Sequence, residues 1–238
     1  MRPLSLLLPL LLSLFAGCAN QEIQRKDGTS SARTFTLSSL AKSDVDIITE
    51  LNQREIHKSL RLIAEKLYRR NPSEYRKTGF ESPEAATERI FEHLANWPES
   101  PLAKLNWEDN FKLAFQDAYG GDRVYAFMTA LTTMVMASYN HKTAFFLPDE
   151  VSAQKLYNSA RNIETAVWKL SNARYGGTGG RMLISNSMDG EVQNLSFERE
   201  FGKLIAQQDL LALIMEDRGN RSISRVFQNA ASFAFLPI

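Results

Sequence analysis

From residue 43 onward, apolar residues recur at the alternating spacing of three and four that is typical of amphipathic helices. The clearest case is the segment that carries Ile56, Leu60, Ile63 and Leu67 on one face. Ser43 precedes it as a favourable N-cap, and acidic residues suited to a first helical turn follow. The pattern predicts a long helix that begins at Ser43 and turns one face to a core.

The same periodicity, together with caps and breakers, predicts five more helices, with expected spans of 82–96, 107–119, 122–139, 149–174 and 196–218. A further short helix before the apolar C-terminal residues 233–238 is left open, and this tail is expected to dock into the bundle. Residues 182–185 are a candidate short strand, but strand signals are otherwise nearly absent. We therefore predict an all-α bundle of about six to seven helices.

Residues 124–140 carry no formal charge and are rich in Ala, Met, Phe and Leu. A membrane span is one interpretation, but the 17 residues lie at the short limit for a span and include three threonines and a serine. A helix that is apolar on all sides is otherwise one that its neighbours bury. We predict that this segment is the buried central helix of the bundle.

The first 17 residues differ in character from the rest of the chain. Arg2 is followed by a run from Pro3 to Phe15 that is almost wholly apolar, and small residues come next. A positive charge, a short apolar region and a small-residue exit are typical of a secretory signal peptide. The run is short for a membrane anchor, since a spanning helix needs about 20 apolar residues.

Phe15-Ala16-Gly17-Cys18 resembles the lipobox of bacterial lipoproteins, with Phe15 in place of the usual leucine. In that family a peptidase cuts before the cysteine, whose sulfur receives a diacylglycerol and whose amino group is acylated with a chain such as palmitate. The resemblance implies that Cys18, the only cysteine of the chain, is the site of lipid attachment. The alternative is an ordinary signal peptide with an incidental cysteine, although a lone exposed thiol is a liability in an oxidising compartment.

In enteric-type bacteria, aspartate directly after the cysteine retains such lipoproteins at the inner membrane, whereas Ala19 and Asn20 follow Cys18 here. The resemblance thus implies the periplasmic face of the outer membrane, with the acyl chains on Cys18 as the membrane contact. Residues 18–42 are polar and without periodicity, and we expect a flexible tether. The predicted organisation is a signal peptide at 1–17, the tether at 18–42 and a single α-helical domain at 43–238.

The overall charge favours no class of partner. The 28 Lys and Arg residues include Arg2, so that without residues 1–17 the basic and the acidic residues number 27 each. A balanced chain has no field that would attract nucleic acid, and no nucleic-acid partner is expected. With a single cysteine there are no internal disulfides, so packing must stabilise the domain.

Charge is nevertheless distributed unevenly. Residues 54–77 hold eight Lys or Arg against three Glu, and residues 81–109 hold seven acids against two bases. A basic stripe lies opposite the apolar face of the first helix and consists of Arg54, Lys58, Arg61 and Arg69. It is our candidate surface for anionic lipid headgroups or an acidic partner, and the alternative is that the two helices offset each other's charge.

Enzyme motifs are weak in this chain. The strings S-x-x-K, S-x-N and K-T-G of penicillin-binding enzymes occur at 39–42 and 152–155, at 138–140 and at 77–79, but in the wrong order. The histidines, His57, His93 and His141, show no metal-ligand spacing, so we predict no metal and no cofactor. The glycine-rich stretch 176–181 lacks the features of a phosphate loop and indicates a helix end, with a binding loop as the alternative.

The sequence therefore predicts a lipid-anchored envelope protein that acts by binding and not by catalysis. An interaction or scaffold module facing the periplasm is the leading hypothesis. A carrier of a lipid or other apolar ligand, lodged between helices such as 124–139, is the second, and an envelope hydrolase is the third. A protein partner, a co-purifying apolar molecule, or a cleft with a perturbed carboxylate or histidine would distinguish the three.

Changing Cys18 to Ala is expected to abolish acyl labelling and to release the protein from the membrane fraction, because the acyl chains that would hold it cannot be attached. Metabolic labelling with a tagged fatty acid, followed by fractionation, measures both effects. Unchanged labelling of the variant would refute the lipobox assignment.

Overall fold

The computed structural model describes residues 23, 25–26, 28, 41–186, 191–192 and 194–234, and for residues 95 and 220–234 the backbone alone. The chain divides into two compact units, Met1–Ala41 and Lys42–Ile238, and the helices named below belong to the second. Cys18 and residues 235–238 lie outside the described residues. Lipidation of Cys18 and docking of the apolar tail therefore stay predictions.

The second unit is built from helices. Its α-helices are α2 (Asp44–Arg70), α3 (Pro72–Arg76), α4 (Pro83–Phe91), α5 (Trp107–Ala114), α6 (Arg123–Ser138), α7 (Ala153–Asn172) and α8 (Ser196–Ala234). Short 3-10 helices accompany them: η2 (Leu94–Glu99), η3 (Pro101–Lys104) and η4 (Tyr175–Gly177). Over the described residues there are seven α-helices and no strand, so the prediction of an all-α bundle is confirmed.

α2 begins where the capping pattern predicts. The Ser43 hydroxyl accepts a hydrogen bond from the backbone N–H of Asp46, and the Asp46 carboxylate accepts one from the backbone N–H of Ser43 at 2.7 Å. This reciprocal arrangement satisfies two backbone donors at the helix start. The apolar face predicted from the sequence, which includes Ile56, Leu60 and Ile63, is fully buried.

Three predicted helices are four or five residues too long at one end. The helix expected at 82–96 ends at Phe91, because the residues after it tighten into η2, which contains Pro98 and a kink at Asn96. The helix expected at 107–119 ends at Ala114, because the backbone carbonyl of Ala114 accepts a hydrogen bond from the Arg123 side chain. The helix expected from 149 begins at Ala153, because Ser152 is its N-cap.

The predicted strand at 182–185 is wrong. An isolated bridge joins Arg174 to Arg181, and beyond it Ile184 gives and receives one backbone hydrogen bond with the side-chain amide of Asn71, each at 2.8 Å. The Asn71 side chain on α2's C-cap thus takes the place of a neighbouring strand. The predicted end of the last helix at 218–220 is also wrong, since α8 continues to Ala234, and one interior glycine costs a helix only about 1 kcal/mol.

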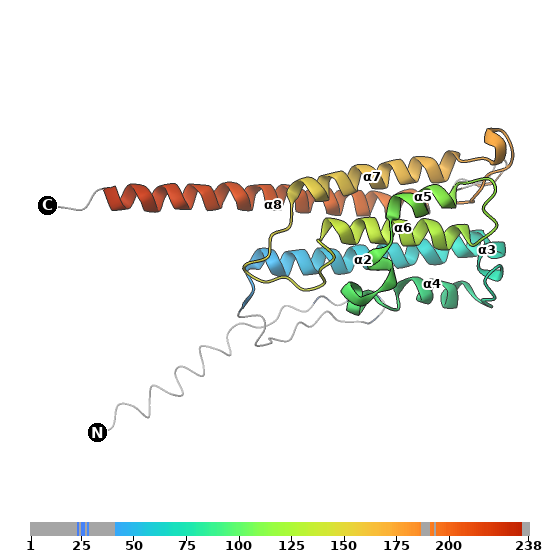
Figure 1. The fold of residues 1–238 in the computed structure, drawn as a ribbon, viewed down its shortest axis with the longest axis horizontal. Helices are drawn as coiled ribbons and strands as arrows, with labels where there is room; N and C mark the ends of the chain where they lie inside the picture. Colours follow the sequence, from blue (N-terminus) through green and yellow to red (C-terminus); the bar gives the residue numbers. More distant parts are fainter. Residues whose placement is uncertain are drawn as a thin grey trace, which may run out of the picture. The chain divides into compact units, whose positions relative to one another are not determined.

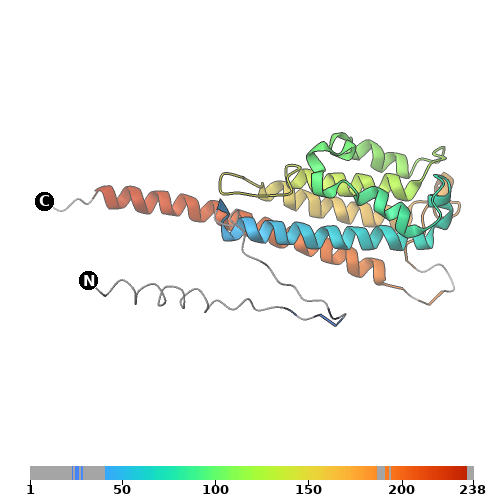
Figure 2. The same cartoon turned by 90° about the horizontal axis from the view of Figure 1, so that it is seen from below.

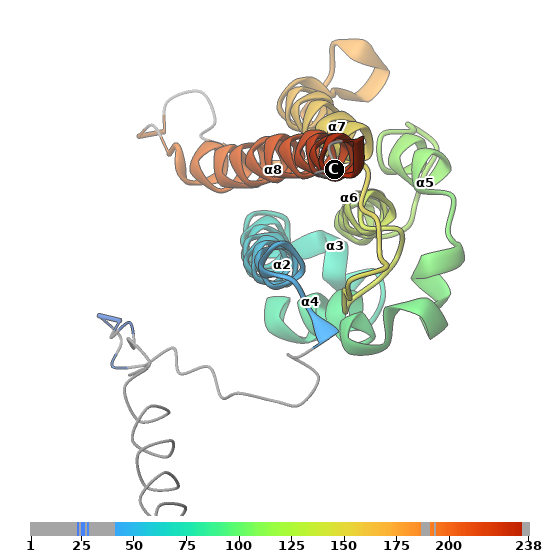
Figure 3. The same cartoon turned by 90° about the vertical axis from the view of Figure 1, so that its left-hand side faces the viewer.

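α6 is the buried centre of the bundle, as the sequence predicts. Of its 16 residues, 14 are buried, and it packs against α2, α3, α4, α5 and α7. Figure 3 views the bundle along its length and shows α6 among these helices. No helix in the described part of the chain has the length and apolarity to cross a bilayer. Burial by the neighbouring helices therefore accounts for the uncharged segment at 124–140.

α8 packs along α2 and α7 with its first half, and its second half extends past the ends of both (Figures 1 and 2). A buried polar contact fixes the register of this packing. The Gln208 amide, fully buried, donates to the hydroxyls of Ser159 at 3.0 Å and Ser138 at 3.3 Å. One side chain of α8 thereby contacts both α7 and α6. Because Gln208 is buried, water could not replace these hydrogen bonds if the register shifted.

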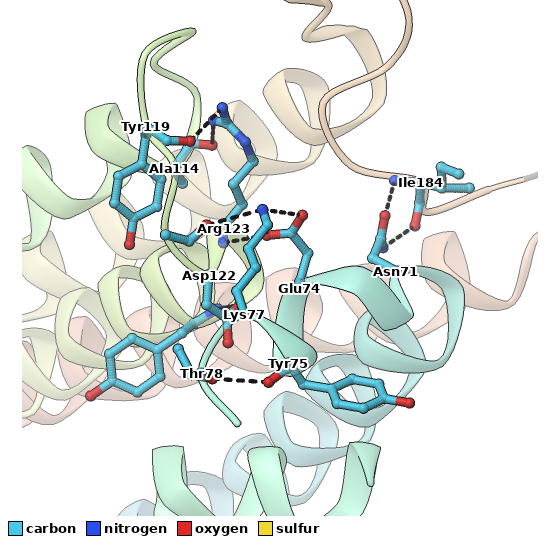
Figure 4. A network of polar contacts seen from close by, with 12 residues as sticks. Asn71, Glu74, Tyr75, Lys77, Thr78, Ala114, Tyr119, Asp122, Arg123 and Ile184 are labelled. Atoms are coloured by element: carbon cyan, nitrogen blue, oxygen red, sulfur yellow. Dashed lines mark hydrogen bonds and ion pairs between the residues drawn. The ribbon is translucent and has the colours of Figure 1, made fainter. Parts of the chain in front are cut away.

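The opposite end of α6 is held by a buried arginine. Arg123 is 1% exposed, and its guanidinium donates to the backbone carbonyls of Ala114, Gln116, Asp117 and Tyr119 at 2.9–3.3 Å. Figure 4 shows the guanidinium turned toward this loop. The carbonyls at the end of α5 carry partial negative charge, so a cation stabilises them. Arg123 therefore fixes where α5 ends and how the chain turns into α6.

Two carboxylates complete this corner of the bundle (Figure 4). Glu74 accepts from the backbone N–H of Arg123 at 2.8 Å and from the Lys77 ammonium at 2.7 and 2.8 Å. Asp122 caps α6 through the N–H of Tyr125 at 2.9 Å and accepts from the Tyr68 hydroxyl at 2.9 Å. Burial raises the pKa of Asp122 above its ordinary value. The corner thus joins α2, α3 and α6 through buried polar contacts.

Replacing Arg123 with Met, which keeps the length and apolar volume, is expected to lower the free energy of unfolding by about 3 kcal/mol, because buried carbonyls lose their donors. Urea unfolding followed by circular dichroism, on the protein in detergent, measures the loss. Lys112→Met on α5 is the matched control, since the Lys112 side chain is 74% exposed. A loss no larger than that of the control would contradict the role assigned to Arg123.

Candidate functional site

The basic stripe predicted from the sequence lies on α2, and glutamates of α4 form ion pairs with two of its four residues. The side chains of Arg54, Lys58, Arg61 and Arg69 are 51%, 54%, 42% and 60% exposed. Arg61 pairs with Glu88 of α4, and Arg69 pairs with Glu84 of α4 at 2.9 Å. Lys58 pairs with Glu55 of its own helix at 2.7 Å.

These contacts agree with the alternative in which the two helices offset each other's charge. The Arg61 guanidinium, which donates hydrogen bonds to Glu88, lowers the pKa of that carboxyl. Exposed ion pairs of this kind contribute only about 0–1 kcal/mol each, so they do not prevent the arginines from meeting another anion. A partner for the stripe stays a prediction.

The glycine-rich stretch 176–181 binds a carboxylate of the protein itself, that of Asp117. The backbone N–H of Gly176 donates to both carboxylate oxygens of Asp117, at 3.1 and 3.2 Å. Gly176 has a positive φ of 57°, which a residue with a side chain seldom adopts. The Tyr175 ring lies 5.1 Å from the Arg123 guanidinium. The loop is thus attached to the chain between α5 and α6.

The K-T-G string does not come together with the S-x-N string, so the three strings of penicillin-binding enzymes do not form one site. Lys77 of K-T-G donates to the carbonyl of Gly121, just before α6, whereas Ser138-x-Asn140 lies at the other end of that helix. The 16 residues of α6 separate the two strings by about 24 Å. Among the described residues, no group of three or more His, Cys, Asp or Glu is arranged to hold a metal ion.

α5 and α7 both pack on α6 but make no comparable contact with each other (Figure 3). Side chains of these three helices and of the cap after α6 line a groove, here the α5–α7 groove. Its wider part, about 500 Å³, is lined mainly by polar side chains, among them Asn140, His141, Lys155, Asn158 and Asn162. Its narrower part, about 130 Å³, is lined mainly by apolar ones, among them Phe111, Ala130, Leu131 and Ala166. Trp107, Met134 and Asn162 line both parts, so the groove is continuous from a polar to an apolar end.

The C-terminus of α6 brings polar residues into the groove through an unusual cap. The N–H of His141 donates to the carbonyl of Met136 at 2.8 Å, and the N–H of Asn140 donates to that of Ala137 at 3.1 Å. This pair of bonds is the Schellman motif, which places the residue after the C-cap in the left-handed region. Here Asn140 and also His141 are left-handed, with φ of 53° and 57°. Among the described residues, they are the only ones other than glycine with positive φ.

A hydrogen bond fixes the protonation of His141. The indole N–H of Trp97 donates to His141 Nδ1 at 3.0 Å, and the planes of the two rings are nearly parallel, 4° apart. Because an indole nitrogen can only donate, Nδ1 must be unprotonated and the neutral ring must carry its proton on Nε2. Burial, with a smaller effect of the Lys155 charge, lowers the pKa of His141. His141 therefore lines the groove as a neutral hydrogen-bond donor.

A second surface, here the α7–α8 face, comprises the exposed large apolar side chains of α7 and α8. Tyr157 and Leu213, 48% and 62% exposed, line a groove between the two helices, and Trp168 and Leu210, 64% and 60% exposed, lie on the same helices outside that groove. The groove has a volume of about 570 Å³. The small residues Ala153 and Ala212 line it beside Tyr157 and Leu213. Arg161 also lines it, held by Asp209 of α8 at 2.6 Å. The face combines exposed aromatic and aliphatic groups with an ordered charge pair.

Sequence patterns alone identified neither surface. Lys155 and Asn140 appeared in the sequence only as parts of two strings typical of penicillin-binding enzymes, yet the structure joins them through a 2.8 Å hydrogen bond from Nζ to Oδ1. One local signal was available, since an asparagine after an apolar helix is a frequent left-handed cap. The position of α7 beside that cap depends on tertiary packing.

Comparison with known proteins finds no match for this chain among protein-family models, curated proteins or solved structures. Function is therefore inferred from the surfaces of the bundle themselves.

The half-buried histidines His57 and His141 are expected to make stability depend on pH. Burial lowers the pKa of His57 from 6.5 to about 4, and the pKa of His141 is lowered as well. The unfolded chain binds these protons from pH 6.5 downward and the folded chain does not, so stability is complete above pH 6.5 and is lost as the pH falls toward about 4.

Nuclear magnetic resonance titration of the imidazole signals measures the two pKa values directly. Urea unfolding between pH 7 and pH 4 measures the loss of stability, and His57→Gln, which cannot titrate, is expected to make the dependence shallower. A His57 signal that titrates near 6.5 would contradict the assignment.

Proposed function

We propose that the protein is a lipid-anchored protein of the bacterial outer membrane whose helical domain acts as an interaction module in the periplasm. The N-terminal resemblance supports the anchor at Cys18 and the location. The α7–α8 face is the observation that carries the interaction: Tyr157, Trp168, Leu210 and Leu213 are each about half exposed or more. Tyr, Trp and Arg are the residue types that most often dominate protein–protein binding energy.

The shape of this face favours an amphipathic helix of another envelope protein as the partner. α7 and α8 run antiparallel, as the sequence colours of Figure 1 show, and they are joined by the contact of Arg161 with Asp209. The groove between them has small residues, Ala153 and Ala212, beside the exposed Tyr157 and Leu213. Helices bind such grooves by inserting apolar residues spaced at three and four. Arg161 and Glu216, which also line the groove, would meet polar groups of the partner.

A second function, carriage of a small apolar ligand, is favoured by the α5–α7 groove. Its narrow part of about 130 Å³ is lined mainly by apolar side chains of three helices. Pockets that bind small molecules are typically apolar with a few polar groups that fix the orientation. A carrier and an interaction module are compatible in one domain, because the two surfaces use different faces of α7.

A double substitution of Tyr157 and Leu213 by Ser is expected to remove the protein partner, because truncating two central apolar contacts typically weakens such an interface at least 30-fold. Native mass spectrometry of the complex, gently extracted from its own membrane, measures the stoichiometric adduct. Leu62→Ser is the matched control, since Leu62 is an exposed leucine of α2, which lies outside this face.

Retention of the adduct by the Leu62 variant and its loss from the double variant would support the α7–α8 face as the docking surface. An adduct of undiminished abundance in the double variant, or a protein that carries no protein adduct from its native membrane, would overturn the proposal.

A further inference from the structure

The charge along the α5–α7 groove is confined to one point. Among the described residues that line its two parts, Lys155 carries the only formal charge, because His141 is held neutral by Trp97. The one carboxylate of α7, that of Glu164, does not line the groove and pairs with Arg161 at 3.2 Å. A groove with one cation and no anion selects against a cationic ligand and favours a single negative charge.

The groups around Lys155 are held in place by the protein itself. Lys155 Nζ donates to Asn140 Oδ1 at 2.8 Å, and the Asn140 amide nitrogen donates to the backbone carbonyl of Glu150 at 2.8 Å. Asn158 accepts from Gln154 at 2.8 Å. Lys155 uses one of its three N–H donors on Asn140, so two are available to a ligand.

Two further polar groups have bonding capacity to spare. His141 presents Nε2–H, since its other nitrogen is engaged by Trp97. Asn162 lies where the polar and the apolar parts meet, and among the described residues its side-chain amide has no hydrogen-bond partner. Polar groups that line a cavity without a protein partner are available to a ligand. The donors are thus grouped at one end of the groove.

The left-handed conformation at Asn140 and His141 is a second observation at this site. Such a conformation costs an L-residue about 1–2 kcal/mol, less for Asn, and persists only where surrounding contacts impose it. Glycine would meet the backbone requirement at Asn140 without this cost. Asn140 and His141, which occupy these strained positions, both line the groove, and Asn140 binds Lys155.

The other end of the groove is apolar and narrow. Phe111, Leu131 and Met134 line it together with the small residues Ala130 and Ala166. Trp107 lines both ends, so a ligand that spans the groove would lie along the indole ring. A volume of about 130 Å³ fits one short chain or a small ring and not a diacyl lipid. Each buried methylene contributes about 0.8 kcal/mol to binding.

We propose that the α5–α7 groove binds a small amphipathic monocarboxylate, with its carboxylate at Lys155 and His141 and its apolar body against Trp107 and Phe111. One lysine matches the single charge of a carboxylate, whereas a phosphate monoester would bring about 1.5–2 negative charges. The neutral donors at His141 and Asn162 supply hydrogen bonds without a second charge. This inference rests on the second proposed function, carriage of an apolar ligand, and names the chemistry of that ligand.

Fluorine resonances of the three tryptophans provide a local test of the proposal. The lipidated protein, labelled with 5-fluorotryptophan and held in lipid nanodiscs, is titrated with octanoate and separately with the neutral octanol, both below micelle formation. Octanoate is expected to shift the Trp107 signal in a saturable way. The signal of Trp168, which lies on the α7–α8 face, serves as the internal reference and is expected to stay in place.

The variants separate the head of the ligand from its body. Lys155→Met is expected to weaken octanoate binding at least tenfold and to leave octanol binding unchanged. Lys169→Met is the matched control, since it removes the same charge from the same helix about 21 Å away and is expected to change neither. Thr165→Phe, which fills the narrow part from its exposed rim, is expected to weaken both ligands.

The outcomes distinguish this inference from the function on which it rests. Equal affinity for octanoate and octanol, or octanoate binding that survives Lys155→Met, would overturn the carboxylate site and leave an apolar carrier. A Trp107 signal that neither amphiphile shifts would overturn both. Saturable binding of octanoate that requires Lys155 and is blocked by Thr165→Phe would establish the proposed site.

Discussion

The buried guanidinium of Arg123 is the contact on which the geometry of this bundle depends. It collects four backbone carbonyls from the end of α5 and the following loop, while its backbone N–H is bound by Glu74 after α2. A cation can remain in a protein interior only when nearly every donor is satisfied. The loop carbonyls meet that requirement. Because they accept hydrogen bonds from Arg123, they are not available for the backbone hydrogen bonds that would extend α5. The same corner anchors the glycine-rich loop through Tyr175 and Asp117.

The α5–α7 groove follows from this constraint and from the small side chains of α6. α5 is only eight residues long and packs on α6 without comparable contact with α7. Where larger residues on α6 and α7 would fill the space between the two flanking helices, Ala130, Ala137 and Ala166 leave it open. At the far end of α6, the left-handed cap at Asn140 and His141 directs polar groups into the same space. The apolar and the polar ends of the groove thus have separate structural origins along one helix.

α7 connects the two surfaces for which we propose functions. Lys155, Asn158 and Asn162, spaced at three and four, lie on the side that faces the α5–α7 groove. Tyr157, Arg161 and Trp168, also in helical register, lie on the side next to α8. A ligand and a protein partner would therefore contact different sides of the same helix. Residues 18–42, the predicted tether, would give a domain held at the membrane the reach to meet such a partner.

The sequence by itself determined the helical class, the start of α2 at Ser43 and the burial of α6. These features depend on local periodicity, helix caps and the apolarity of a whole segment, all of which are visible in neighbouring residues of the sequence. It also indicated that the basic stripe and the acidic segment 81–109 could offset each other, and Arg61 and Arg69 do pair with α4.

Tertiary structure alone decided the rest. The end of α5 depends on Arg123, nine residues beyond the carbonyl of Ala114, and the segment at 182–185 depends on Asn71, more than a hundred residues earlier. The pairing of Lys155 with Asn140 and the open donors of His141 and Asn162 arise because α7 packs beside the cap of α6. Contacts between residues distant in sequence leave no periodic trace, so the fold class could be predicted from the sequence and the groove could not.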